Sequence, residues 1–232
     1  DKKFTDSRQN IYITESGEIP KEWQICQVSD CCNIVNNLRK PINVDERKEM
    51  VGQYPYYGPT KIQGYLDEFA YDGEYALIGE DGDHFLKYKE WPMTILVSGK
   101  FNVNNHAHVI GGTSICRTKW FYQYFRHRCI YSYLTRQGAK RFKLTKESLS
   151  QMPILLPSVN EQDRIIEIIE SWDKAIEHKG FIIEQKKLQK MGIADRLLSG
   201  KIRLSQFTGI PEYRQLRTYI REVSKKNKTG EV

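Results

Sequence analysis

The sequence of 232 residues has no long hydrophobic run, and no stretch approaches the roughly 20 apolar residues that a membrane-spanning helix requires. Residues 1–6 lack the apolar core of a secretory signal peptide. The cysteines are few and odd in number, five in all, and none forms a C-x-x-C pair, which disfavours a disulfide scaffold and suits a reducing compartment. We therefore expect a soluble, cytoplasmic protein without a membrane segment.

The sequence also lacks the motifs of common enzymes. It has no G-x-x-x-x-G-K-[ST] phosphate loop, no G-x-G-x-x-G fingerprint and no G-x-S-x-G elbow. His106 and His108 have the spacing of two metal ligands, but nothing completes the set, so structural histidines are the favoured interpretation. Residues 80–83 are typical of a turn, and Cys31 and Cys32 of core or surface thiols. We expect no catalytic residue, metal or cofactor in this chain, and favour a binding module.

Positive charge is present but spread along the chain. The formal net charge is +7, of which residues 1–158 carry +3, residues 159–203 carry +1 and residues 204–232 carry +3. Such a balance permits a nucleic-acid partner, but an ordinary basic surface explains it equally well. If nucleic acid is bound, the fold must gather the basic side chains onto one face.

Residues 1–158 have the pattern of a mixed α+β domain. Residues 75–79 and 93–98 are short apolar runs typical of strands. Clusters of glycine, asparagine and aspartate, such as residues 71–73, predict turns that bound these strands. Short strands separated by such clusters favour a sheet over a helical bundle.

The last part of this domain predicts two helices and a strand. The aromatic stretch 120–134 lacks strict alternation and predicts a helix with a buried aromatic face. Thr145 has the position of a cap for a short helix. Residues 152–157 predict an apolar strand closed by proline.

A long amphipathic helix is predicted over residues 159–200. Ser158 and Glu161 have the spacing of a capping box, and Gly200 stands where a C-terminal capping glycine is expected, while Gly180 predicts a kink. About 40 residues at 1.5 Å each make a rod on the order of 60 Å long. Such a rod outreaches one small domain, so we expect it to pair with a second helix; a helix lying on its own domain is the alternative. The expected pairing residues are Ile165, Ile169, Trp172, Ile176, Ile183, Leu188, Met191 and Leu198.

Residues 204–232 form a polar, basic tail. Within it, residues 211–223 predict a short helix and residues 224–230 predict disorder. The chain is therefore expected to comprise a mixed α+β domain (1–158), a long helix (159–203) and this C-terminal tail.

Two loop regions carry side chains suited to nucleic acid. Residues 53–65 interleave tyrosine, glutamine, threonine and lysine, and residues 98–106 combine lysine with three asparagines. Such side chains hydrogen-bond base edges and phosphates. The alternative is that the tyrosines are core residues and the asparagines form turns. The candidate DNA-contacting residues are Tyr56, Tyr57, Lys61, Gln63, Lys100, Asn102, Asn104 and Asn105.

The order of the segments resembles one half of a type I restriction–modification specificity (S) subunit, over about residues 15–204. Each matching piece is weak alone, but their order together with the long helix is specific. The pieces are GEIPKEW at 17–23, YPYYG at 54–58, LIGEDG at 77–82, NNHAHV at 104–109, KLTKESL at 143–149, MPILLP at 152–157, Glu161-Gln162 and LLSGKIR at 197–203.

This resemblance implies a target recognition domain followed by a spacer helix, which pairs with a second such helix in an antiparallel coiled coil. It implies double-stranded DNA as a partner and no catalytic residue in this chain. Methyltransferase (M) subunits would bring S-adenosylmethionine, and a restriction (R) subunit would bring ATP and Mg²⁺. A homodimer would read a palindromic split site; pairing with a second half of a longer subunit is equally open.

Two other functions stay open at this stage. The chain could be the recognition part of a fused restriction enzyme or methyltransferase whose catalytic part lies outside it. It could also be a coiled-coil adaptor that binds only protein. Recognition loops differ between members of the family, so the DNA-contacting residues above rest on residue chemistry and not on the resemblance.

Overall fold

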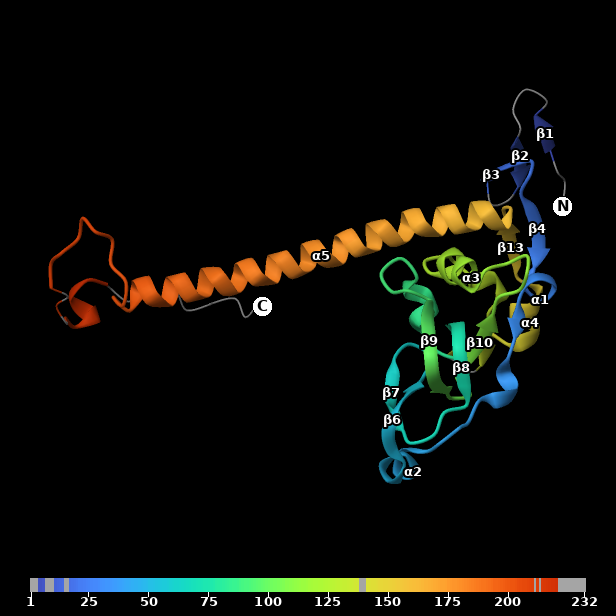
Figure 1. Cartoon of the computed structure of the whole chain (residues 1–232), viewed down its shortest axis with the longest axis horizontal. Helices are drawn as coiled ribbons and strands as arrows, with labels where there is room; N and C mark the ends of the chain where they lie inside the picture. Colours follow the sequence, from blue (N-terminus) through green and yellow to red (C-terminus); the bar gives the residue numbers. More distant parts are fainter. Residues whose placement is uncertain are drawn as a thin grey trace, which may run out of the picture. The chain divides into compact units, whose positions relative to one another are not determined.

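A computed structural model describes residues 4–6, 11–14, 17–137, 141–210, 212 and 214–220. The chain divides into two compact units, Asp1–Trp172 and Asp173–Val232. The first unit holds all the sheets and the beginning of the long helix α5 (Val159–Leu198), and the second holds the rest of α5 and the segment after it (Figure 1). The mixed α+β class predicted from the sequence is confirmed.

A six-stranded mixed sheet is the centre of the first unit. The strand order is β5–β10–β8–β9–β6–β7, and all neighbours run antiparallel except β6 and β9, which are parallel. The strands are β5 (Asn33–Ile34), β6 (Val51–Tyr57), β7 (Ile62–Leu66), β8 (Tyr71–Gly79), β9 (Thr94–Val103) and β10 (Ala107–Gly111).

The strands predicted at residues 75–79 and 93–98 are confirmed as parts of β8 and β9, and both strands are longer than predicted. The turn predicted at residues 71–73 is wrong, because these residues belong to β8. Gly73 pairs with Gly99 across the β8–β9 ladder, and both have positive φ, +139° and +86°. Two facing glycines let the strands continue through a backbone conformation that other residues rarely adopt.

Helices and short sheets cover the central sheet. The helix α3 (Thr118–Phe125) packs on β8, β9 and β10, and its aromatic face belongs to the larger of two core clusters. Alternation along β8 places Ala76 and Ile78 in this cluster and Leu77 in the second one. The remaining elements of this unit are β1 (Phe4–Asp6), β2 (Ile11–Thr14), β3 (Gly17–Pro20), β4 (Gln24–Gln27), α1 (Val28–Cys31), α2 (Val44–Glu49), β11 (Thr135–Gln137), β12 (Arg141–Lys143), α4 (Lys146–Gln151), β13 (Pro153–Leu156) and the 3₁₀ turns η1 (Asn36–Leu38), η2 (His84–Lys87) and η3 (Tyr131–Tyr133).

The helix predicted over residues 120–134 is wrong beyond Phe125, where α3 ends. The Arg126 carbonyl accepts a hydrogen bond from the Met93 amide at 2.7 Å, so a tertiary partner takes the acceptor that a longer helix would use. The His127 ring contacts the Tyr88 carbonyl at 2.8 Å, which holds the departing chain against the segment before β9. Aromatic composition alone does not reveal these two contacts.

The short helix and strand predicted after Thr145 are confirmed. The Thr145 hydroxyl accepts from the Ser148 amide at 3.0 Å and caps α4. The strand β13 pairs antiparallel with β4, from the beginning of the domain. This pairing brings the two ends of the domain together just before α5 begins.

The long predicted helix is confirmed as α5, which continues through Gly180 and Gly192 as one helix. At its start, the Ser158 hydroxyl accepts from the Glu161 amide at 3.3 Å, and the Glu161 carboxylate accepts from the Trp23 indole at 3.1 Å. At its end, Gly200 has a φ of +73°, and its amide donates to the Leu197 carbonyl. The predicted positions of both helix ends are therefore confirmed, but only the serine half of the capping box is formed, because the Glu161 carboxylate binds Trp23.

The segment after α5 contains one 3₁₀ turn, η4 (Leu216–Thr218). The helix predicted at residues 211–223 is limited to this turn among the described residues, and the prediction for residues 224–230 lies outside them. Over the described part of the chain, no helix combines the length and the apolar character needed to cross a membrane.

Candidate nucleic-acid interface

A polar hollow of about 470 Å³ opens where α2 and the β6–β7 hairpin lie, at the end of the first unit away from β13 and α3 (Figure 1). Its walls come from four separate elements: the segment before α2, α2 itself, the hairpin, and the turn between β9 and β10. The lining residues are 41–44, Arg47, Tyr56, Gln63 and 104–106. The hollow therefore gathers four of the eight candidate DNA-contacting residues.

Tyr56 forms the floor of the hollow and is buried. Its hydroxyl donates to the Lys40 carbonyl at 2.8 Å and accepts from the Ile42 amide at 3.1 Å. The Arg47 guanidinium lies over its ring, 5.3 Å from the centroid. Burial raises the pKa of the Tyr56 hydroxyl, which stays neutral. Tyr56 thus anchors the segment that leads into α2, and its polar atom is used within the protein.

Two of the candidate asparagines are also buried and engaged. The Asn102 amide donates to the Glu68 carbonyl at 2.7 Å. The Asn104 amide donates to Gln63 Oε1 at 3.0 Å, and its Oδ1 accepts from the His106 amide at 2.8 Å. Asn104 shapes the β9–β10 turn, which agrees with the alternative interpretation of asparagine as a turn former, whereas Asn102 lies in β9 and fixes the loop between β7 and β8.

The remaining candidates face solvent to different degrees. Lys61, Gln63, Lys100 and Asn105 are exposed, whereas Tyr57 is half-buried with its ring 5.9 Å from that of Phe101. Gln63 packs on Gly58, where an added Cβ would lie 2.4 Å from Gln63 Nε2. The Lys100 ammonium lies over the Phe69 ring at 4.5 Å. The exposed candidates therefore surround the hollow or lie on the strands beside it.

A part-buried charge network supports the turn that carries Asn105. Arg39 donates to Glu80 Oε2 at 2.7 Å and to the carbonyls of Asn105 and Ala107 at 3.2 and 3.0 Å. Lys143 contacts the other oxygen of Glu80 at 3.2 Å. The Glu80 carboxylate is thus held by two cations, and the predicted turn at residues 80–83 acts as a support for the turn beside the hollow.

His108 is buried behind the same turn. Its Nδ1 lies 2.8 Å from the Asn36 amide nitrogen and its Nε2 lies 2.7 Å from the Leu144 carbonyl, which fits a neutral ring that accepts at Nδ1 and donates at Nε2. Burial lowers the pKa of His108, and the hydrogen bond to Leu144 and the nearby Glu80 oppose this effect. The structural interpretation of this histidine is supported by both contacts.

Sequence reasoning missed one charge pattern. Residues 91–146 contain ten lysines and arginines and no aspartate or glutamate. Three of these cations reach acids elsewhere: Arg117 to Asp163, Lys119 to Glu170 and Lys143 to Glu80. Arg128 and Arg136 lie over aromatic rings, at 4.0 Å from Tyr124 and 5.5 Å from Phe142. Counting acids over a window, rather than over whole domains, would have revealed this basic segment.

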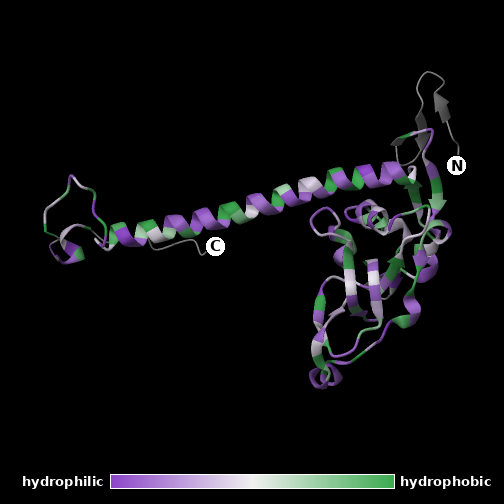
Figure 2. Ribbon diagram, in the orientation of Figure 1, coloured by the Kyte–Doolittle hydropathy of each residue, from purple (hydrophilic) through white to green (hydrophobic). Residues whose placement is uncertain are grey.

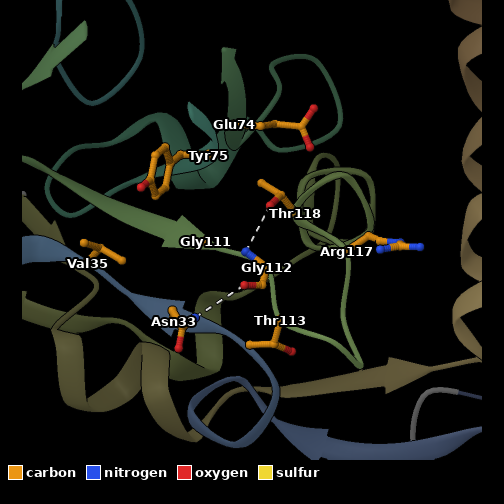
Figure 3. Close-up of a pocket in the computed structure, with 9 residues that line it drawn as sticks. All are labelled: Asn33, Val35, Glu74, Tyr75, Gly111, Gly112, Thr113, Arg117 and Thr118. Atoms are coloured by element: carbon orange, nitrogen blue, oxygen red, sulfur yellow. Dashed lines mark hydrogen bonds between the residues drawn. The ribbon is translucent and has the colours of Figure 1, made fainter. Parts of the chain in front are cut away.

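A second hollow, of about 400 Å³, lies beside β5, β8 and the loop before α3 (Figure 3). Two hydrogen bonds shape its wall: Asn33 Nδ2 donates to the Gly112 carbonyl at 3.4 Å, and the Gly112 amide donates to Thr118 Oγ1 at 2.9 Å. Arg117 points toward α5, where it donates to both oxygens of Asp163 at 2.9 Å (Figure 3). With its arginine engaged and Glu74 on its wall, this hollow suits phosphate less well than the first.

The start of α5 is fixed to the domain through Gln162, which is fully buried. Its Oε1 accepts from the Arg117 amide at 2.9 Å, and its Nε2 donates to the carbonyls of Ile115 and Pro157 at 2.8 and 3.0 Å. Ile165, one of the predicted pairing residues, packs partly buried against the larger core cluster. The first turns of α5 therefore contact their own domain.

Further along α5 the predicted pairing residues are exposed. Hydrophobic bands recur along the helix (Figure 2). Ile169 is half-buried, whereas Trp172 and Ile176 are each 67% exposed and Leu198 is 89% exposed. A stripe of large apolar side chains in contact with water is typical of an interaction surface. The exposed members are Trp172, Ile176, Ile183, Leu188, Met191 and Leu198.

The fold and the family agree. The chain belongs to the family of type I restriction modification DNA specificity domains, whose family model matches residues 20–186. A putative type I restriction enzyme specificity subunit from Haemophilus influenzae is 35% identical over 159 residues, which cover 68% of this chain and 38% of the relative. A putative type I MjaX specificity subunit from Methanocaldococcus jannaschii is 21% identical over 82% of this chain and 49% of its own length.

Two solved structures have a similar fold. The S subunit of a type I restriction–modification system from M. genitalium superposes with a TM-score of 0.57 at 16% identity, over 76% of this chain and 46% of that one. A chain from a structural study of type I complex assembly and conformational transition gives a TM-score of 0.55 at 14% identity, over 78% and 47%. The chain therefore spans less than half the length of the relatives it matches.

Proposed function

We propose that this chain is a sequence-recognition element of a type I restriction–modification complex and binds double-stranded DNA. The observation that carries the proposal is the match of residues 20–186 to the DNA specificity family. The polar hollow beside α2 supports it physically, because its walls combine the amide side chains of Gln63 and Asn105 with the guanidinium of Arg47.

In this proposal some exposed side chains around the hollow contact base edges and others contact phosphates. Asn105 and Gln63 carry amide groups that pair with base edges, and Lys61 contacts a phosphate. Tyr56, Asn102 and Asn104 position these groups through the hydrogen bonds described above. The basic segment 91–146 adds attraction to the DNA backbone that does not depend on sequence.

The second part of the proposal concerns pairing through the long helix α5. Its exposed apolar stripe packs antiparallel on a second helix of the same kind, from another copy of the chain or from the other half of a longer subunit. Two recognition domains held this way read a split DNA site, which is palindromic when both are copies of this chain. The fixed attachment of α5 at Gln162 supports this role, because it transmits the helix position to the domain.

The proposed partners follow from the family. Methyltransferase subunits would carry S-adenosylmethionine, and a restriction subunit would carry ATP and Mg²⁺ chemistry, so catalysis would lie outside this chain. The domain boundaries proposed for this work are a recognition domain over residues 1–158, a spacer helix over 159–203 and a basic tail over 204–232.

DNA binding is tested with the full chain and its methyltransferase subunit, using fluorescence anisotropy on duplexes over a series of salt concentrations. The change Lys61→Ala is expected to weaken binding to all sequences and to reduce the slope of log affinity against log salt by about 1. The change Asn105→Ala is expected to cost about 1–3 kcal/mol of preference for the specific duplex over a scrambled one.

The control is Lys190→Ala, which removes the same charge from α5 and is expected to leave the salt slope and the preference unchanged. Wild-type complex that shows no preference for any duplex in a random library would contradict DNA recognition itself. A specific complex whose preference survives both changes at the hollow would instead move the interface elsewhere on the domain.

A further inference from the structure

Three cysteines from two segments that are far apart in sequence meet in the core of the domain. Cys31 is the last residue of α1, Cys32 follows it directly, and Cys116 lies in the loop before α3. The Cys32 sulfur lies 3.5 Å from that of Cys116 and 3.8 Å from that of Cys31, and all three sulfurs lie within 4.8 Å of one another. All three side chains are buried. No C-x-x-C spacing predicts this cluster, because Cys32 and Cys116 are 84 positions apart in the sequence.

The spacing of the sulfurs matches a metal–thiolate site. A metal–sulfur bond of about 2.3 Å in tetrahedral geometry places neighbouring sulfurs about 3.8 Å apart. The two shorter separations in the cluster are already 3.5 and 3.8 Å, so small side-chain movements would complete the arrangement. Thiolate ligands select zinc, copper(I) and iron–sulfur clusters over hard cations such as Mg²⁺.

The backbone around the cluster is held rigidly. Thr113, in the same loop as Cys116, donates through its hydroxyl to the Cys31 carbonyl at 2.7 Å. The Thr113 amide donates to the Cys116 carbonyl at 2.8 Å. The first bond connects the two segments that carry the thiols, and the second fixes the loop around Cys116, so the ligands are positioned before any ion arrives.

A surface hollow borders the cluster at Cys32, the only one of the three cysteines with any exposure, at 5%. A hollow of about 550 Å³ is lined by Cys32 together with Ser29, Asn33, Lys146 and Ser150. An ion could enter at Cys32, and a water molecule from this hollow could take a fourth coordination position.

We propose that Cys31, Cys32 and Cys116 form a three-thiolate site for a zinc-class metal ion, which fastens α1 to the loop before α3. The site is structural and separate from DNA recognition, since it lies in the core between α1 and α3 while the proposed interface lies beside α2. On binding, the coordinating thiols lose their protons to solvent, and the ion stabilises the folded domain.

The probe for this site is Co²⁺, added to the full chain after reduction and removal of metal under anaerobic conditions. We expect one Co²⁺ per chain, with intense thiolate-to-cobalt absorption that added Zn²⁺ abolishes. The change Cys116→Ser is expected to remove most of this absorption. The matched control Cys129→Ser changes an exposed cysteine outside the cluster and is expected to leave the absorption and the stoichiometry unchanged.

A second measurement, thermal unfolding with and without Zn²⁺, tests the site even if one variant fails to fold. Zn²⁺ is expected to raise the unfolding temperature of the wild-type chain and of Cys129→Ser alike, and a folded Cys32→Ser chain is expected to gain much less. The proposal is overturned if reduced, folded wild-type chain binds less than about 0.1 Co²⁺, if the absorption survives Cys116→Ser, or if mass spectrometry finds Cys32 and Cys116 joined by a disulfide in the freshly isolated protein.

Discussion

The α+β domain and the part of α5 from Trp172 onward differ in the burial of their apolar side chains. In the domain, aromatic residues such as Tyr71, Phe101 and Phe121 are almost fully buried in two clusters. Along α5 from Trp172 onward, large apolar residues are mostly exposed, Ile176 to 67%. The domain thus buries its apolar side chains in its own core, whereas the helix has a stripe of apolar side chains that the described residues leave exposed.

This contrast distinguishes residues that stabilise the fold of the domain from residues that form a surface for pairing. In the domain, buried polar residues such as Asn104 fix loops and turns through hydrogen bonds within the domain. In the proposed pairing, a second helix buries the repeating apolar pattern of α5, because burial of such a stripe is what stabilises most helices. The predictions below test whether the two regions differ in this way, from the largest expected effect to the smallest.

A charge in the apolar stripe is expected to have the largest effect. The change Ile176→Asp places a carboxylate in the proposed helix pair, where desolvation without a partner is costly, so paired chains should separate. Light scattering during size-exclusion chromatography measures this as a loss of the paired mass. The control His178→Asp lies about 200° around the helix and is expected to leave the mass unchanged. A paired mass that survives Ile176→Asp would remove the stripe from the interface.

Removing the buried side-chain amide of Gln162, at the start of α5, is expected to lower the free energy of unfolding of the domain. The change Gln162→Leu leaves the Arg117 amide and two carbonyls without their hydrogen-bond partner, at a cost of about 3 kcal/mol in the free energy of unfolding. Urea unfolding followed by tryptophan fluorescence reports this cost. The exposed Gln185→Leu on the same helix is the control and should shift the unfolding free energy by less than about 0.5 kcal/mol. Equal effects of the two changes would mean that α5 is not anchored at Gln162.

Acid is expected to weaken the domain through His108. Its pKa in the folded state is below its ordinary value of 6.5, so the unfolded state binds more protons once the pH falls below about 6.5. The contribution of the neutral ring is therefore present above pH 6.5 and is lost as the pH falls toward the lowered pKa, with a slope of at most about 1.4 kcal/mol per pH unit.

Urea unfolding at pH 7.5, 6.5 and 5.5 measures this slope. The variant His108→Gln should be less stable at pH 7.5, because two hydrogen bonds are disturbed, but it should lose less stability on acidification than the wild type. Lowered pKa values at both His84 and His108 contribute, so the variant keeps part of the slope. An unchanged slope in His108→Gln would show that its ring does not titrate in this range.

The ion pair between Lys119 and Glu170 is expected to give the smallest effect. The two side chains are partly exposed, with the ammonium 2.7 Å from the carboxylate, and such pairs contribute at most about 1 kcal/mol. The change Lys119→Ala should lower the unfolding free energy by less than Gln162→Leu does. In high salt, the unfolding free energies of Lys119→Ala and the wild type should become equal. A larger loss that persists in high salt would mean that the lysine stem, not its charge, holds α5 to the domain.

The sequence was most informative where a pattern is local and periodic. The helix α5 and its ends followed from apolar spacing, a serine cap and a terminal glycine, and α4 followed from Thr145. Local pattern failed at Phe125, where a contact with Met93 ends α3, and at Gly73, which pairs with Gly99 inside a strand. Both failures have one physical cause, since the deciding partner is distant in sequence.

The candidate site was predictable only as a region. Residue types placed Gln63 and Asn105 near nucleic-acid chemistry, but only the fold shows that Asn104 is buried between Gln63 and His106 while Asn105 stays exposed. The support from Arg39 and Glu80 was invisible, because it joins segments 41 residues apart. The cysteine cluster was missed for the same reason.

The central claim is that α5 joins two recognition domains, which then read a split DNA site. The most direct test is to map modified bases in cells that express this chain as the only specificity chain together with its methyltransferase. The account predicts a motif that depends on the chain and consists of two inverted half-sites separated by a spacer of fixed length. An uninterrupted motif, or a pattern of modification that does not change when the chain is removed, would contradict it.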